Sequence, residues 1–405
     1  MSSLSSQNRR VLSGMRPTGR LHLGHYHGVL KNWIELQRTH ECFFFVADWH
    51  ALTTHYEDPR VIGGSVWEMV IDWLAAGLDP RAATVFIQSH VPEHAELHVL
   101  LSMLTPLSWL ERVPSFKDQQ AQLKERDLAT YGFLGYPLLQ SADILIYRAG
   151  HVPVGEDQVP HVEFTREIAR RFNYLYGREP DFAAKSEDAV RRLGKKSAME
   201  FQDFCRAYQE QGEPQALERA RALLEESVNL SIADRERLLG FIEGTGKMIL
   251  PEPLPLLTKA SKMPGLDGRK MSKSYGNTIE LREPPEHVER KLRTMPTDPA
   301  RVRRIDPGEP EKCPVWPLHQ QYSGDEIQAW VQHGCRTAGI GCLDCKQPVI
   351  DAIKAELAPI QERAKEYERD VDTVRDIVAQ GCRTARDIAR ETLTEVRRVM
   401  GLGYR

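Results

Sequence analysis

Short apolar runs alternate with longer helical patterns over the first hundred residues. The runs cover residues 10–12, 42–48 and 83–88, and their length and content are typical of strands buried on both faces. Between them, apolar residues recur at helical spacing over residues 24–36 and 63–76. Strands that alternate with helices predict an α/β fold with a parallel sheet, whose ligands lie beyond the carboxyl ends of the strands.

Residues 180–248 have a different character. They are charged and rich in Ala, Leu and Glu, with apolar residues at helical spacing over 214–228 and 232–242. This pattern predicts a helical insertion.

The chain from residue 284 onward is again mostly helical in pattern. Long periodic stretches cover residues 349–367 and 373–400, the second interrupted by Gly381. They predict an α-helical C-terminal domain.

Composition limits the class of protein without naming it. With 405 residues and 41% hydrophobic content, the chain is long enough for a sizeable core. Its longest apolar run is far shorter than the roughly 20 residues that span a bilayer, and its N-terminus has no signal-peptide core. We therefore expect a soluble cytoplasmic protein with no membrane partner. The net charge of −3 leaves RNA binding undecided, because a local basic face would suffice.

A loop rich in Gly and His follows the first predicted strand. Residues 14–26 read Gly-Met-Arg-Pro-Thr-Gly-Arg-Leu-His-Leu-Gly-His-Tyr, so that His22 and His25 flank Gly24 at a helix start. A glycine there lets a nucleotide approach the backbone, and helix-start amides with two imidazole donors suit phosphate oxygens. A His-rich helix start without a ligand is the alternative interpretation.

A second polar segment lies far downstream, at residues 267–274. It reads Asp-Gly-Arg-Lys-Met-Ser-Lys-Ser and places Lys270 and Lys273 three positions apart. Mobile lysines suit a pyrophosphate leaving group, whose negative charge grows as its bond to the α-phosphate breaks. On its own, a basic loop of this kind is usually a solvated turn.

His-Leu-Gly-His at 22–25 (the first signature) and Lys-Met-Ser-Lys-Ser at 270–274 (the second signature) together resemble the two signatures of class I aminoacyl-tRNA synthetases. The resemblance implies a Rossmann-like catalytic domain in which an amino acid attacks the α-phosphorus of ATP, with Mg²⁺, before its transfer to tRNA. The catalytic residues that it implies are His22, His25, Lys270 and Lys273. The ATP-binding residues that it implies are Arg16, Thr18, Gly24, His25, Gly155, Asp157, Lys270, Met271, Ser272, Lys273 and Ser274.

Asp143 lies among apolar residues in the stretch 136–147, and an unpaired buried carboxylate is costly. A salt bridge within a helix is one explanation. In the tryptophan and tyrosine branch of class I, which this stretch resembles, the matching aspartate receives the polar ring hydrogen of the substrate. The resemblance thus makes Asp143 the acceptor for an indole N–H, and its full set of substrate residues is Asp143, Tyr136, Gln158 and His50.

The segment 154–158, Val-Gly-Glu-Asp-Gln, resembles an element of the same branch. In that element the aspartate engages the ATP ribose and the glutamine engages the ammonium group of the amino acid. A strand-to-helix turn with a capping Asp157 explains these residues as well. Three longer stretches, 45–53, 110–118 and 163–173, resemble tryptophanyl-tRNA synthetases and favour tryptophan over tyrosine.

Two residues depart from the family pattern, since Arg16 stands where many relatives have Gln, and His25 where many have Asn. Both remain hydrogen-bond donors, so we expect their roles to survive. Three rivals stay open: a tyrosyl-tRNA synthetase, a non-catalytic RNA-binding paralogue, and a nucleotidyltransferase of the same superfamily that acts on a small molecule. The sequence has no Walker-type phosphate loop, which disfavours an ordinary kinase or ATPase.

Four of the seven cysteines crowd into one region. Cys313, Cys335, Cys342 and Cys345 have 21, six and two residues between successive sulfurs. Four thiolates suit zinc or an iron–sulfur cluster. The spacing resembles that of a subset of bacterial tryptophanyl enzymes with a [4Fe–4S] cluster, although its first gap is one residue shorter. On this resemblance we prefer a [4Fe–4S] cluster to Zn²⁺.

These patterns divide the chain into four segments. Residues 1–179 and 249–283 are expected to form the catalytic domain, 180–248 the insertion, and 284–405 a helical anticodon-binding domain that holds the cysteines. The partners implied by the resemblance are tRNA(Trp), L-tryptophan and ATP, with a homodimer. Basic residues that could meet phosphates or anticodon bases, although solvation explains them equally, are Arg336, Lys346, Arg383 and Arg386.

Overall fold

A wholly parallel five-stranded sheet forms the centre of the computed structural model, which describes residues 9–113, 130–177, 181–257 and 263–404. The strands are β1 (Arg10–Met15), β2 (Glu41–Val46), β3 (Ala83–Ile87), β4 (His151–Val154) and β5 (Leu254–Leu257). Their order in the sheet is β3-β2-β1-β4-β5. The order reverses between β1 and β4, and ligands of such sheets bind at the carboxyl edge beside that reversal.

Helices make up most of the remaining described chain. In chain order they are α2 (Leu23–His25), the π-helical η1 (Tyr26–Leu30), α3 (Lys31–Leu36), α4 (Asp48–His55), α5 (Arg60–Ala76), η2 (Gln88–His90), α6 (Glu93–Ser102), α7 (Leu107–Glu111), α9 (Tyr131–Ile146), η3 (Glu156–Gln158), α10 (Val159–Tyr176), α11 (Phe182–Arg192), α12 (Lys195–Gln209), α13 (Pro214–Glu226), α14 (Ile232–Ile242), η4 (Lys273–Tyr275), α15 (Pro285–Thr294), η5 (Pro310–Lys312), α16 (Trp316–Tyr322), α17 (Asp325–Arg336), α18 (Cys342–Arg369) and α19 (Val371–Val399). Within the described ranges, no helix combines the length and the apolar character needed to cross a membrane.

Side chains of β2 cover both faces of the sheet, as the period of two residues in a strand requires. Phe44 stacks on Trp33 of α3 with ring centroids 4.3 Å apart, and Phe43 stacks on Tyr147 at 5.1 Å. All four rings are almost completely buried. The predicted parallel α/β fold is therefore confirmed, and the sheet lies inside the main hydrophobic core.

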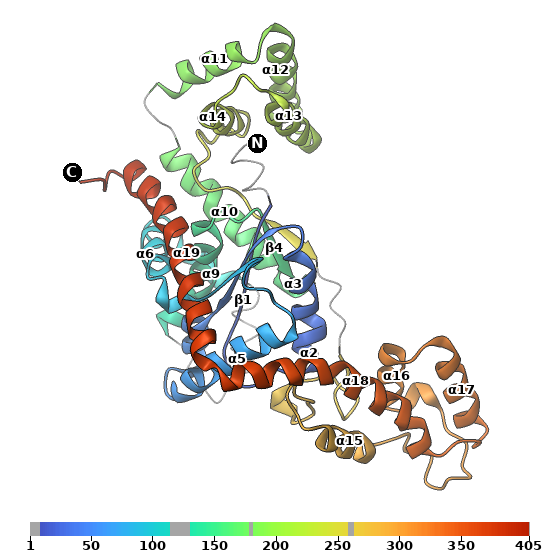
Figure 1. Ribbon diagram of the computed structural model, residues 1–405. Coiled ribbons are helices and arrows are strands. Elements are labelled where there is room, and N and C mark those ends of the chain that lie inside the picture. The colour runs from blue at the N-terminus through green and yellow to red at the C-terminus, as the bar shows by residue number, and fades with distance from the viewer. Residues whose placement is uncertain (1–8, 114–129, 178–180, 258–262, 405) are drawn as a thin grey trace.

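The two C-terminal helices return to the sheet. The helix α18 packs against α5, and α19 packs against the edge strand β3; Figure 1 shows α19 running along the sheet. The predicted interruption at Gly381 was wrong, because α19 runs unbroken through that residue. A Cβ at Gly381 would lie 1.8 Å from the carbonyl oxygen of Val85. Glycine therefore lets the helix lie directly on the strand.

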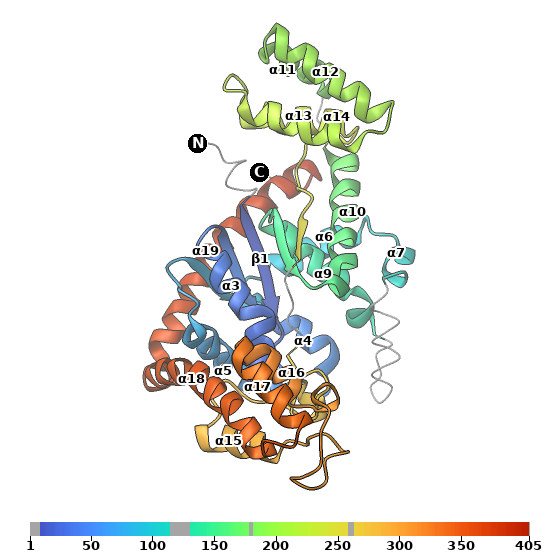
Figure 2. The same ribbon diagram turned by 90° about the vertical axis from the view of Figure 1, so that its right-hand side faces the viewer.

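Helices α11–α14 form a separate layer at the amino edge of the sheet. The helix α10 starts beyond the carboxyl end of β4 and returns to the amino edge, where the insertion begins and from which β5 starts. Figures 1 and 2 show α11–α14 at one end of the molecule and α15–α17 at the other. The insertion helices bury an apolar cluster of their own, which includes Phe201, Leu224 and Leu238.

Candidate active site

Two segments far apart in sequence pair beyond the carboxyl end of β1. The amide of Leu23 donates to the carbonyl oxygen of Ile279 at 3.0 Å. The amide of Leu281 donates to the carbonyl oxygen of Leu21, also at 3.0 Å. This short antiparallel pairing places the first signature beside the chain that follows the second signature.

The second signature itself also contacts the first loop. Nζ of Lys273 donates to the carbonyl oxygen of Thr18 at 3.1 Å, across 255 positions of sequence. A Cβ at Gly24 would lie 3.7 Å from Cβ of the buried Met271, and only 2.8 Å from Cε1 of His22. Glycine leaves room for the imidazole of His22 to fold over the helix start, and Met271 places the second signature beside the first.

The imidazoles of the first signature are neutral hydrogen-bond donors. Nδ1 of His22 accepts from the amide of Gly24 at 3.1 Å, and the amide of His22 donates to Nδ1 of His25 at 3.3 Å. Each ring therefore carries its proton on Nε2. Burial, with Lys273 nearby, lowers the pKa of His22 to about 4, and burial with His22 and Lys273 lowers the pKa of His25 well below its usual value. Both rings stay uncharged at neutral pH.

The second signature is held by a buried asparagine that the sequence did not single out. Oδ1 of Asn277 accepts from the amide of Ser272 at 2.8 Å, and its Nδ2 donates to Oδ1 of Asp267 at 2.7 Å and to the carbonyl oxygen of Lys270 at 3.2 Å. The backbone is fixed in this way while Lys270 and Lys273 remain exposed. The neighbouring protein partly desolvates the amine of Lys273 and lowers its pKa, and Asp72 and Glu280 only partly offset this.

Arg16 and Thr18 lie on the loop between β1 and α2, at the predicted nucleotide side. The side chain of Arg16 is exposed to solvent, yet the protein around it lowers its pKa, against the influence of Tyr136. Tyr136, whose charge acts on Arg16, lies on α9. The structure brings the predicted ATP residues of this loop close to a predicted tryptophan residue.

Asp143 is the centre of a buried hydrogen-bond network. Its Oδ1 accepts from Nε2 of Gln88 at 2.8 Å and from Nδ1 of His94 at 2.6 Å, while its Oδ2 accepts from Nε2 of His50 at 2.7 Å. Burial alone would raise the pKa of Asp143, but the hydrogen bonds from His50 and His94 outweigh it and lower the pKa to about 2. A carboxylate has about four acceptor positions, so one position on Oδ2 remains for another donor.

Sequence reasoning found Asp143 and His50 but missed Gln88 and His94. The partners come from other elements, so the salt bridge within one helix that was the alternative does not occur. Gln88 directly follows β3 at the carboxyl edge, which is a signal that could have identified it. No local sequence signal identifies His94. It lies 49 residues from Asp143 in the sequence, and only the packing of α6 on α9 brings the two side chains together.

The segment after β4 reaches the same edge of the sheet. Asp157 and Gln158 lie on η3, where Nε2 of Gln158 donates to Oδ2 of Asp157 at 3.1 Å. A Cβ at Gly155 would lie 2.8 Å from Oδ1 of Asp157. The ring of Tyr136 lies 5.7 Å from that of His161 on the helix that follows. All the predicted ATP and tryptophan residues therefore come from loops and helices at the carboxyl edge. Of the stretch 110–118 that resembled tryptophanyl enzymes, Pro114 to Asp118 lie outside the described residues.

The four clustered cysteines lie together among α16, α17 and α18, beside η5. Burial, with the thiols of Cys313, Cys335 and Cys342 beside it, raises the pKa of Cys345 to about 12. Sγ of Cys345 lies 3.4 Å from Nε2 of His319. Among the residues that the structure describes, no three His, Cys, Asp or Glu side chains stand in an arrangement that would hold a metal ion. The thiols are neighbours, but the metal site stays a prediction.

The four basic residues considered as contacts for RNA all have protein partners. Arg336 pairs with Glu311 at 2.6 Å, and Arg386 pairs with Glu93 of the catalytic core at 2.8 Å. The other two are Arg383, which donates to Gln380, and Lys346, which is buried and donates to the carbonyl oxygen of Arg293. Only Lys346 is withdrawn from solvent, whereas the side chains of Arg336 and Arg383 are exposed.

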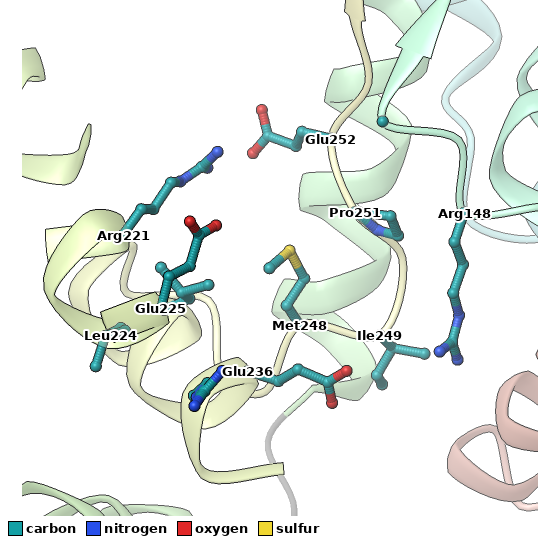
Figure 3. A pocket seen from close by; sticks show the side chains of 12 residues that line it. Arg148, Arg221, Leu224, Glu225, Glu236, Met248, Ile249, Pro251 and Glu252 are labelled. Carbon is teal, nitrogen blue, oxygen red and sulfur yellow. The ribbon is translucent and has the colours of Figure 1, made fainter. Parts of the chain in front are cut away.

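A cavity of about 80 Å³ lies at the amino edge of the sheet, under the insertion. Figure 3 shows it between α13 and α14 on one side and the chain leading into β5 on the other. Its lining mixes arginines and glutamates, among them Arg221, Glu225, Glu236 and Glu252, with apolar side chains such as Met248. None of the predicted ATP or tryptophan residues lines it.

Comparison with known proteins agrees with this geometry. The family model described as tRNA synthetases class I (W and Y) matches residues 5–189 and 233–358, and leaves out 190–232 within the insertion. A tryptophan–tRNA ligase from Ralstonia nicotianae is 69% identical over 98% of this chain and 99% of the relative. The chain belongs to the tryptophan–tRNA ligase family. A second member, from Thermotoga maritima, is 44% identical over 98% of the chain and 100% of the relative.

Solved structures of the family share the fold of this chain. The tryptophanyl-tRNA synthetase of Campylobacter jejuni, complexed with ADP and tryptophan, matches with a TM-score of 0.71 and 26% identity. That match covers 97% of this chain and 100% of the other. The Rossmann-like fold implied by the two signatures is therefore confirmed.

Proposed function

We propose that this chain activates L-tryptophan with ATP, giving tryptophanyl-AMP and pyrophosphate, and then transfers tryptophan to the 3′ end of tRNA(Trp). The relatives named tryptophan–tRNA ligase match it over nearly their whole length. The observation that carries the proposal is the pairing of Leu23 with Ile279 and of Lys273 with Thr18, which puts both signatures around one space. Phosphoryl transfer depends mainly on positioning and charge neutralisation, which such a space provides.

The activation step needs no covalent enzyme nucleophile. The tryptophan carboxylate attacks the α-phosphorus in line, and the bond to the pyrophosphate oxygen breaks. His22 and His25, as neutral Nε2–H donors, hold phosphate oxygens without requiring a proton from solution. Lys270 and Lys273 neutralise the charge that grows on pyrophosphate. Mg²⁺ bound with the triphosphate supplies further neutralisation.

We assign the remaining ATP contacts to residues at the same carboxyl edge of the sheet. Arg16 and Thr18 approach the nucleotide from the first loop, and Asp157 engages the ribose. The backbone at Gly155 leaves room for that contact. The serines and methionine of the second signature support the lysines through the loop that Asn277 fixes.

Selectivity for tryptophan is assigned to Asp143, whose Oδ2 has an acceptor position left for the indole N–H. His50 orients that oxygen, and Tyr136 and Gln158 hold the ammonium group. Phenylalanine is rejected because it would leave the buried acceptor without a donor, which discriminates far more strongly than a missing methylene.

The test is pyrophosphate exchange into ATP with tryptophan, tyrosine or phenylalanine as the only amino acid. We expect exchange that depends on tryptophan, followed by charging of tRNA(Trp). Exchange with tyrosine would make the protein a tyrosyl enzyme, and tRNA binding without exchange would make it a non-catalytic paralogue. Adenylyl transfer to a small molecule other than an amino acid would indicate the nucleotidyltransferase.

We further propose that the four cysteines hold a [4Fe–4S] cluster, with Zn²⁺ as the alternative. The chemistry of the donors fits, because four neighbouring thiols suit either group, and Nη1 of the buried Arg301 lies 3.8 Å from Sγ of Cys335 to balance negative charge. Zinc binds sulfur at roughly 2.3 Å and draws its four ligands tightly together. A cluster is preferred to zinc because the spacing of Cys313, Cys335, Cys342 and Cys345 resembles that of the iron–sulfur subset. When bound, the group would link the end of η5 to α17 and α18.

Iron, acid-labile sulfide and zinc measured per chain on anaerobically purified protein distinguish the two groups. Cys342→Ser should abolish binding of the group, whereas Cys205→Ser, in the insertion, should keep it. Full iron content in Cys342→Ser, or neither metal in the wild-type protein, would contradict the assignment.

A cytoplasmic homodimer is the proposed assembly. Val99 on α6 and Met103, which caps the end of that helix, are half or more exposed. Tyr131 on α9 is 66% exposed, and its ring lies 6.5 Å from that of His98 on α6. Exposed apolar side chains gathered in this way are typical of interfaces. Light scattering should give a dimer for the wild type and a monomer for Met103→Asp, while a monomeric wild type would refute the proposal.

The domain division also stays a proposal: a catalytic domain from 1–179 and 249–283, an insertion from 180–248 and an anticodon-binding domain from 284–405. Helices α11–α14 bury an apolar cluster of their own, which supports the boundaries of the insertion at residues 180 and 248. The packing of α19 on β3 ties the end of the third segment to the catalytic sheet.

A further inference from the structure

Asp72 lies on α5, outside both signatures, and contacts the chain beside each of them. It is only 2% exposed. Its Oδ2 accepts from the amide of Leu21 at 3.2 Å, directly before His22. Its Oδ1 accepts from Nε of Arg282 at 2.6 Å. One buried carboxylate thus holds two segments that are far apart in the sequence.

The contacts of Asp72 close a ring. Arg282 follows Leu281, whose amide donates to the carbonyl oxygen of Leu21. The guanidinium of Arg282 is mostly buried and also pairs with Glu68 of α5 and Glu368 of α18. The carboxylate of Asp72 therefore binds both the Leu21 amide and Arg282, and the residue before Arg282 binds Leu21 in turn. The first loop cannot move relative to the chain after the second signature without breaking a buried charge pair. Breaking such a pair is strongly destabilising.

The charge of Asp72 depends on these partners. Burial raises its pKa to about 6, while Arg282 and the amide of Leu21 oppose the rise. The carboxylate is therefore mainly ionised at neutral pH. It also acts electrostatically on Lys273 of the second signature.

We propose that Asp72 is a positioning residue for tryptophan activation, which sets the separation between the two signatures so that their donors address a single triphosphate. This inference rests on the proposed function. A misplacement of about 1 Å can cost on the order of 100-fold in rate. Loosening the ring should therefore impair the reaction of ATP and leave the tryptophan pocket around Asp143 intact, since that pocket is built from other elements.

Asp72→Asn keeps the shape and removes the charge, and its amide can accept only one of the two contacts. Arg282→Lys keeps the charge but cannot span Asp72, Glu68 and Glu368 at once. The matched control is Asp234→Asn, because Asp234 is 3% exposed, pairs with Arg192 and Arg237, and lies in the insertion.

The experiment measures kcat and KM for ATP in tryptophan-dependent pyrophosphate exchange, together with the Kd for tryptophan and the thermal midpoint of each variant. We expect kcat/KM for ATP to fall on the order of 100-fold in Asp72→Asn and by less in Arg282→Lys, with the tryptophan Kd unchanged. The double variant should lose less than the sum of the two, since both break one contact. Asp234→Asn should lose stability but keep its exchange kinetics.

A folded Asp72→Asn with normal exchange kinetics would overturn the inference, as would an equal kinetic loss in Asp234→Asn. If Asp72→Asn does not fold, Arg282→Lys decides, and normal ATP kinetics in that variant would again overturn it. A wild-type protein without exchange would refute the proposed function instead.

Discussion

Replacing Asp143 by Asn changes one atom in the tryptophan pocket and removes its charge. Oδ1 accepts from Gln88 and His94, so the asparagine oxygen is expected to take that place. The NH₂ group then stands where Oδ2 was, facing His50 and the space assigned to the indole N–H. The NH₂ group of the asparagine then faces the N–H groups of His50 and of the indole. All three are donors, so the indole N–H loses its acceptor.

The effect has two parts. The pKa of Asp143 is lowered from 3.8 to about 2, and a shift of nearly two units corresponds to roughly 2 kcal/mol of folding stability. Because the pKa is depressed in the folded state, this stability is present above the ordinary carboxyl pKa and is lost as the pH falls toward the depressed value. The unpaired indole N–H costs a further 1–3 kcal/mol or so in binding, which weakens tryptophan affinity about 5- to 150-fold.

Urea unfolding at neutral pH gives the first quantity, and calorimetric titration with tryptophan gives the second. Asp234→Asn is the control, with a comparable loss of stability and an unchanged tryptophan Kd. If Asp143→Asn loses the stability but binds tryptophan as tightly as the wild type, Asp143 is a structural residue and the assignment of the indole contact is wrong.

Two more substitutions test separate parts of the structure. Ala at both Lys270 and Lys273 should lower tryptophan-dependent exchange by about 100-fold or more, because removal of a single transition-state donor already costs that much; a large loss of tryptophan affinity in a binding titration would refute the assignment to pyrophosphate. Gly381→Ala should destabilise the fold by about 1–3 kcal/mol, because its Cβ would meet the Val85 carbonyl. Gly63→Ala on α5, where a Cβ would meet nothing within 4 Å, should instead stabilise the protein by about 0.5–1 kcal/mol, and equal thermal midpoints for the two variants would contradict the packing of α19 on β3.

The apolar pattern predicted the sheet's first three strands and the helices that cover α3, α5, α13, α14, α18 and α19, because each is a local feature. Helices such as α4, α6 and α9 were not predicted. The helix expected at 232–242 is α14, and the strand expected at 42–48 is β2, shorter by two residues at its end. The strands β4 and β5 were missed, since each has only four residues and contains a proline. The pairing of β4 with β1 and of β5 with β4 is what makes them strands, and pairing is not visible in a local pattern.

The candidate site likewise has residues that a local sequence pattern predicts and residues that it does not. The signatures were found because their residue types sit close together in sequence. The residues that hold them, such as Asn277 and Asp72, are single polar side chains in unremarked segments, and only burial and long-range contacts reveal them. The prediction at Gly381 was wrong because a glycine in a helical pattern indicates either a break in the helix or a close approach of another backbone. Only the long-range contact with β3 decides between the two.

A crystal structure with tryptophan and a non-hydrolysable ATP analogue tests the central claim most directly. The triphosphate should lie between the Nε2 atoms of His22 and His25 on one side and the amines of Lys270 and Lys273 on the other, with the indole N–H on Oδ2 of Asp143. A nucleotide bound elsewhere, or an indole nitrogen pointing away from that carboxylate, would contradict the account.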